Sequence, residues 1–84
     1  MQITFKLFAS LSDYLPSEAK YANQVLYPLK ENQTVQQIIE AFQLPDKLVH
    51  LVLVNGVYLY PEQRQTHVLK DQDVLAIWPP IAGG

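Results

Sequence analysis

One short amphipathic helix, set between stretches of alternating residues, limits what this chain can fold into. Thr34 and Gln37 have the Thr-x-x-Gln spacing of a capping box, which marks the start of a helix. Four apolar residues then recur at the spacing of one helix face: Val35, Ile38, Ile39 and Phe42. We therefore predict one helix from about Thr34 to Phe42 that packs across one face of a sheet.

Two strands are predicted before this helix. Residues 2–8 alternate in polarity, which indicates a strand with one buried face. That face is expected to hold Ile3, Phe5 and Leu7. Residues 25–29 alternate as well, and Pro28, which has no N–H for a ladder, places this strand at an edge of the sheet. The segment 9–23 between them is expected to be a loop with a short helical turn.

Three strands are predicted after the helix. Residues 49–54 are apolar on both faces apart from His50, which favours a central strand. Asn55-Gly56 has the signature of a type I′ hairpin turn, so that residues 57–59 return as a short strand. The last strand is expected at 74–78, with Leu75 and Ile77 buried beside the apolar face of the helix.

The composition excludes several classes of function. The chain has 84 residues, of which 49% are hydrophobic and 17% charged, as in one globular domain. It contains no cysteine, which excludes disulfides, thiolate metal sites and a cysteine nucleophile. Its six basic residues are scattered and the net charge is −2, so neither nucleic acid nor a membrane is expected as a partner. Because no secretory signal is visible, we expect a cytoplasmic protein.

No catalytic, cofactor-binding or metal-binding constellation is visible among the side chains. His50 is interpreted as a packed or edge histidine. His67 lies near Asp71 and Asp73 in sequence, and these two carboxylates are interpreted as turn formers, because aspartate bonds its own backbone in turns. We therefore expect neither a catalytic side chain nor a metal site.

The last residues are the strongest indication of function. The chain contains three glycines, and two of them are Gly83 and Gly84. Glycine has no side-chain bulk, so this end is thin enough to enter a narrow channel, and it carries a carboxylate at its tip. Pro79 and Pro80 set a stiff extended segment ahead of it. The residues expected to thread are Pro79, Pro80, Ile81, Ala82 and Gly83.

The order of elements and the Gly-Gly end together resemble the MoaD/ThiS sulfur-carrier family over essentially the whole chain. The most specific piece is Pro79-Pro80-Ile81-Ala82-Gly83-Gly84, which is similar to the Pro-Pro-Val-x-Gly-Gly ending of MoaD, the small subunits of molybdopterin synthase. Supporting pieces are Lys6-Leu7-Phe8-Ala9, Val54-Asn55-Gly56 and Leu69-x-Asp71-x-Asp73. One position departs from the pattern, because Gln72 stands where the family commonly has glycine.

The resemblance implies a fold and a division of the chain. The fold is α+β, a ubiquitin-like β-grasp with a mixed sheet and one main helix packed across one face. Residues 1–78 would form the β-grasp domain, and residues 79–84 would form the extended tail that ends in Gly-Gly.

The resemblance also implies a sulfur carrier rather than an enzyme. A MoeB-like activating enzyme would use ATP to adenylate the carboxylate of Gly84, which is then converted to a thiocarboxylate; the carrier itself binds no cofactor. A MoaE-like large subunit, which forms a heterotetramer with the carrier in this family, would receive the tail. That subunit holds the catalytic site, where the sulfur builds the dithiolene of molybdopterin.

Two alternatives stay open. A ThiS-type carrier would serve another pathway, such as thiamine biosynthesis, although the pair Pro79-Pro80 favours the MoaD type. A ubiquitin-like modifier would be joined through Gly84 to lysines of other proteins, whereas a plain interaction module would tolerate the loss of Gly-Gly.

Three aromatic residues are expected to form a partner-binding patch beside the tail. Phe8 and Trp78 have the parity opposite to the core positions of their strands, and Tyr58 is expected to join them across the sheet. Exposed aromatic patches mark binding sites, and aromatic anchors dominate binding energy. The alternative is that these residues cover a second small core under the segment 9–23.

Overall fold

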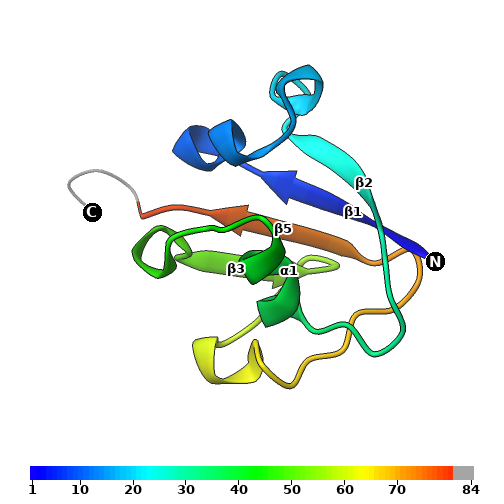
Figure 1. Ribbon diagram of the computed structural model, residues 1–84. Coiled ribbons are helices and arrows are strands. Elements are labelled where there is room, and N and C mark those ends of the chain that lie inside the picture. The colour runs from blue at the N-terminus through cyan, green and yellow to red at the C-terminus, as the bar shows by residue number, and fades with distance from the viewer. Residues whose placement is uncertain (81–84) are drawn as a thin grey trace.

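A five-stranded mixed sheet lies against one α-helix in the computed structural model, which describes residues 1–80 (Figure 1). The strands and the helix are β1 (Gln2–Leu7), β2 (Gln24–Pro28), α1 (Val35–Ala41), β3 (Leu51–Val54), β4 (Val57–Tyr58) and β5 (Val74–Trp78). Short 3₁₀ turns occupy Ala9–Tyr14, Ser17–Ala19, Asp46–Leu48 and Pro61–Gln63. The predicted order of strands and helix is confirmed.

The last strand of the chain forms the middle of the sheet. The strand order is β2-β1-β5-β3-β4, in which β1 and β5 are parallel and the other neighbours are antiparallel. Strand β2 lies at an edge, as Pro28 indicates. The strand predicted at 49–54 is the shorter β3, and it is an inner strand as predicted, because it lies between β5 and the short edge strand β4.

Strand β3 is fully buried on one face only, although its sequence is apolar on both faces. Val52 and Val54 point into the core, whereas Leu51 and Leu53 are half-buried on the opposite face. The sequence shows four apolar residues in a row and so carries no signal for this difference. The helix covers one face of the sheet and leaves the other to solvent.

The helix begins as its capping box predicts. The Thr34 hydroxyl accepts a hydrogen bond from the Gln37 N–H at 3.2 Å, and the Gln37 side-chain oxygen accepts one from the Thr34 N–H at 2.9 Å. These two bonds satisfy N–H groups that a helix start would otherwise leave open. They fix the first turn so that Val35, Ile38 and Ile39 face the sheet, and all three are buried.

The core forms a single cluster between α1 and the sheet. Its fully buried side chains include Ile3, Phe5, Leu7, Val35, Ile38, Ile39, Leu75 and Ile77, all of which were predicted. The prediction that Phe42 is buried is wrong: it is half-buried, because it is the capping residue after the last helical turn. Its ring packs at the margin of the core, with centroids 4.6 Å from Phe5 and 5.5 Å from Tyr27.

The segment between β1 and β2 closes one end of this core. The expected helical turn is present as the 3₁₀ turn Ala9–Tyr14. Leu11, Leu15 and Ala19 of this segment belong to the same core cluster as the sheet and α1. None of the helices within residues 1–80 has the length and apolar character needed to cross a membrane.

Left-handed backbone conformations include those of the two turns that the sequence singles out. Asn55 and Gly56 both have positive φ, 51° and 80°, as the predicted type I′ hairpin requires. Gln72, which replaces the usual glycine, also has a positive φ of 71°, at a cost of about 1 kcal/mol. The Gln72 N–H donates to the Gln2 carbonyl at 2.7 Å, which offsets part of that cost. The predicted turn is therefore formed without glycine.

Candidate functional site

The uncovered face of the sheet carries a patch of apolar side chains near the end of β5. We call it the outer patch; its members are Phe8, Leu51, Leu53, Tyr58, Ala76 and Trp78. Strand pairing brings them together, since Leu51 lies opposite Trp78, and Leu53 lies between Ala76 and Tyr58. The residues of β5 with the other parity, Leu75 and Ile77, are fully buried in the core.

Two of the predicted partner-binding residues form a stacked pair. The rings of Phe8 and Trp78 are nearly parallel, 9° apart, with centroids separated by 4.4 Å. Backbone pairing holds them together, because the Phe8 N–H donates to the carbonyl of Ile77 at 3.2 Å. Stacking fixes both side chains before any partner arrives, which lowers the entropy lost on binding.

Tyr58, the third predicted residue, lies on the same face through its pairing with Leu53. It is 41% exposed and makes an edge contact with Tyr60, with centroids 4.8 Å apart. Tyr60 is 56% exposed, and nothing in its sequence context marks it as a candidate. Leu51 and Leu53 were missed as well, although the Asn55-Gly56 turn would have placed Leu53 opposite Tyr58.

The outer patch is not part of a second core. Phe8, Tyr58 and Trp78 lie outside the core cluster, and the 9–23 segment sends its apolar residues to the main core instead. The structure thus brings the three aromatic residues to one face and leaves them partly exposed. Such surfaces are typical of binding sites.

The tail begins at the margin of the outer patch. Trp78 is both a member of the patch and the last residue of β5, and its carbonyl accepts a hydrogen bond from the His50 N–H at 3.1 Å. Pro79 is buried and Pro80 is exposed. The predictions for Ile81, Ala82, Gly83 and Gly84 lie outside the described residues.

Of the two aspartates near the last strand, Asp73 acts as a turn former, as predicted, whereas Asp71 lies in the turn and binds the backbone of the first strand. Asp73 accepts from the Lys70 N–H at 2.8 Å and from the Asn55 side chain at 2.8 Å. Asn55 in turn accepts from the Val74 N–H at 2.8 Å, which ties the hairpin to the start of β5. Asp71 accepts from the Gln2 N–H at 2.9 Å.

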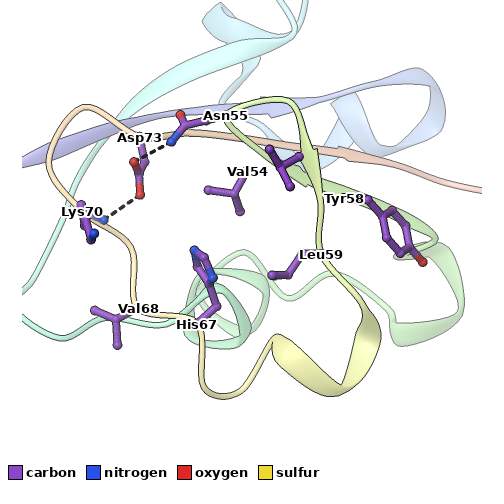
Figure 2. A pocket seen from close by; sticks show the side chains of 9 residues that line it. Val54, Asn55, Tyr58, Leu59, His67, Val68, Lys70 and Asp73 are labelled. Atoms are coloured by element: carbon purple, nitrogen blue, oxygen red, sulfur yellow. Dashed lines mark hydrogen bonds between the residues drawn. The ribbon is translucent and has the colours of Figure 1, made fainter.

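A shallow groove of about 330 Å³ lies beside this turn (Figure 2). Figure 2 shows the His67 ring in the middle of the groove, between Val68 and Leu59, and the bonds of Asp73 to Asn55 and Lys70 at its rim. This rim precedes Val74, so the groove is at the end of β5 opposite to the tail. It is therefore separate from the root of the tail.

The side chains of the described part of the chain offer little chemistry of their own. Across residues 1–80 there is no group of three or more histidine, aspartate or glutamate residues that could hold a metal ion. His50, interpreted from the sequence as a packed or edge histidine, is exposed just before β3. The group whose pKa clearly shifts is Asp71, which lies in a turn. What the fold provides is a preformed surface beside an emerging tail.

Comparison with known proteins identifies the family. The family model described as the ThiS family matches residues 6–84. No curated protein matches the sequence. The family consists of small sulfur carriers and ubiquitin-like proteins, and the match includes the outer patch, Gly83 and Gly84.

Three solved structures share the fold. SAMP1 from Haloferax volcanii is 22% identical with a TM-score of 0.66, and the match covers 100% of both chains. A putative molybdopterin converting factor subunit 1 from Pyrococcus furiosus is 21% identical with a TM-score of 0.64, covering 96% of this chain and 99% of that one. A chain in the complex of subunits 1 and 2 of molybdopterin-converting factor from Helicobacter pylori is 19% identical with a TM-score of 0.60, and the match covers 100% of this chain and 100% of that one.

At these identities the solved structures show only the fold, which is the expected ubiquitin-like β-grasp. The family match shows to which protein family the chain belongs. The chain belongs to the ThiS family of small, ubiquitin-like sulfur-carrier proteins.

Proposed function

We propose that this protein is the small subunit of a molybdopterin synthase and that the carboxylate of Gly84 carries the sulfur. The family match supports the carrier role. The likeness to molybdopterin converting factor subunit 1 and the ending Pro79-Pro80 support the choice of pathway. We further propose that the protein works in the cytoplasm, with a MoeB-like activating enzyme and a MoaE-like large subunit.

The observation that carries this proposal is the continuity of the outer patch with the tail. Trp78 belongs to the patch, and only Pro79 and Pro80 separate it from the segment 81–84. A partner that binds the stacked rings of Phe8 and Trp78 therefore also receives the residues after them. This arrangement suits a protein whose reacting group is its own terminal carboxylate.

The chemistry is dictated by the low reactivity of a carboxylate. Its oxygen attacks the α-phosphate of ATP, so that pyrophosphate leaves and an acyl-adenylate forms. Hydrosulfide from a sulfur source then attacks the acyl carbon and AMP leaves, which gives a thiocarboxylate at Gly84. After the sulfur has attacked the acceptor, water cleaves the acyl–sulfur bond and restores the carboxylate. None of these steps needs a catalytic side chain of the carrier.

The likeness to SAMP1 favours a second candidate, a ubiquitin-like modifier. In that case the activated Gly84 would be attacked by a lysine amine of a target protein and would form a stable amide. A ThiS-type carrier would form the same thiocarboxylate but would pass its sulfur to another acceptor. Both candidates share the activation step with the proposed function and differ in the fate of the activated Gly84.

Intact-mass analysis tests the proposal. The chain is incubated with ATP, a MoeB-like activating enzyme and a sulfur source, and then with a MoaE-like subunit and the molybdopterin precursor. We expect a mass shift of one oxygen replaced by sulfur, localised to Gly84, and its loss when precursor and large subunit are added. Covalent adducts on lysines would favour the modifier, and a thiocarboxylate that the large subunit does not discharge would favour another pathway.

Two variants serve as controls for the tail. Deletion of Gly84 moves the terminal carboxylate back by one residue, to Gly83, so that it falls short of the reacting position, and Gly83→Val adds a branched side chain where a narrow channel must be threaded. We expect both to abolish sulfur transfer and to melt at the temperature of the wild type. Full transfer activity in the deletion variant would show that the carrier chemistry has been assigned to the wrong group.

A further inference from the structure

The uncovered face of the sheet carries one charged side chain, that of Lys6. All eight aspartate and glutamate side chains of the chain lie outside the five strands. On β1, Lys6 has the outward parity, opposite to the fully buried Phe5 and Leu7. In the register of the sheet it lies beside Ala76 of the outer patch, and Leu53 lies on the other side of Ala76.

Lys6 is held against apolar surface. Ala76 is only 6% exposed although it points away from the core, since Lys6 and Leu53 flank it on the two neighbouring strands. Lys6 itself is half-buried beside Ala76 on β5, and Leu26, 60% exposed, is on the same face of β2, opposite Thr4. Lysine commonly places its methylene groups on apolar surface in this way and keeps its ammonium in water.

No carboxylate of residues 1–80 pairs with this ammonium. Within that range, the one ion pair joins Lys20 and Asp13, at 3.9 Å, in the segment between β1 and β2. The nearest cross-strand neighbour of Lys6 on β2 is Gln24, which is uncharged. In a protein with a net charge of −2, Lys6 is therefore a cation beside the apolar patch that has no ion-pair partner among residues 1–80.

We propose that the large subunit that docks on the outer patch presents a carboxylate to Lys6, so that this lysine selects an apolar partner surface containing one acidic side chain. This inference rests on the proposed function. A partner that covers the patch removes water from the Lys6 ammonium, which is costly without a counter-charge. An opposed carboxylate removes that cost and sets the register of docking, whereas a wholly apolar surface is disfavoured.

The test is a calorimetric titration of the full-length chain against the MoaE-like large subunit of the same organism, at low and high ionic strength. The variants are Lys6→Glu, Lys6→Met and Trp78→Ala, with Lys20→Glu as a charge-matched control away from the face. We expect Lys6→Glu to raise Kd by about tenfold or more. Lys6→Met should raise Kd less, and the Kd of this variant should depend less on salt concentration than that of the wild type. Lys20→Glu should leave Kd unchanged, and thermal melts verify that each variant is folded.

A charge reversal then identifies the partner residue. Acidic residues of the large subunit are replaced one at a time by lysine, and one of them is expected to restore the affinity of Lys6→Glu. If Lys6→Glu binds as tightly as wild type, or Lys6→Met binds more tightly at both salt concentrations, the lysine meets no carboxylate and the inference is wrong. If the inference about Lys6 fails in this way but Trp78→Ala loses binding, the proposed function still stands. If the wild type does not bind the large subunit at all, both the inference and the proposed function are wrong.

Discussion

Asp71 joins the start of β1 to the turn before β5. Its pKa lies below the ordinary value of 3.8, chiefly because its carboxylate accepts the backbone N–H of Gln2. Desolvation, the second-largest effect, raises the pKa, whereas the side chain of Gln72 and the positive N-terminus lower it further. A lowered pKa in the folded state means that the charged form stabilises the fold. This stabilisation is complete above the ordinary value and is lost as the pH falls through the pKa of the folded state.

We therefore expect Asp71→Asn to lower the melting temperature at neutral pH, because an amide accepts the Gln2 N–H more weakly than a carboxylate does. The difference from wild type should shrink as the pH falls below about 4. Thermal melts between neutral pH and strongly acidic pH measure it, with Asp46→Asn as an exposed control. A difference that stayed constant over this range would show that the Asp71 charge plays no part.

At the scale of the elements, α1 packs on the sheet through three buried residues, and Ile39 is one of them. Ile39 is 2% exposed and lies in the core between the helix and the sheet. Truncation to alanine leaves a cavity, so we expect Ile39→Ala to lower the free energy of unfolding by about 2–5 kcal/mol. Chemical denaturation measures the change. Glu40→Ala, on the exposed side of the same helix, should change it by less than about 0.5 kcal/mol.

How well each element could be predicted depends on how local its signal is. The capping box at Thr34 and the alternation of β1 involve residues a few positions apart, and both are confirmed. The run 51–54 has no alternation of its own, so its parity follows from its register with the neighbouring strands, where Leu51 meets Trp78 and Leu53 meets Tyr58. The half-buried Phe42 has a similar cause, since its burial depends on where the helix ends.

The candidate site likewise has features that local sequence predicts and features that depend on pairing between distant strands. The parity of Phe8 and Trp78 within their strands was enough to place both on the outer face. Their stacking, and the contribution of Leu51, Leu53 and Tyr60, arise from pairing between strands that are distant in sequence. The proposal that Gly84 is the reacting group rests on the sequence and the family, because Gly84 lies outside the described residues.

For the whole molecule, the outer patch should matter for binding more than for folding. Trp78 is half-buried and stacks on Phe8, so Trp78→Ala should lower the free energy of unfolding by only about 1 kcal/mol. We expect it to weaken binding of the large subunit by about 2 kcal/mol or more. Calorimetric titration paired with a thermal melt separates the two effects. Unchanged affinity with a collapsed melting temperature would place Trp78 among the residues that hold the fold.

The central position of β5 also bears on how the chain folds. The hairpins β1-β2 and β3-β4 are not paired with each other, and the last strand joins them, in parallel with the first. Pairing between opposite ends of a chain loses much conformational entropy before the stabilising contacts between the strands form, and this slows folding. The sheet is therefore completed only when the final strand is inserted, and a chain cut before residue 74 would leave two separate hairpins with exposed, aggregation-prone edges.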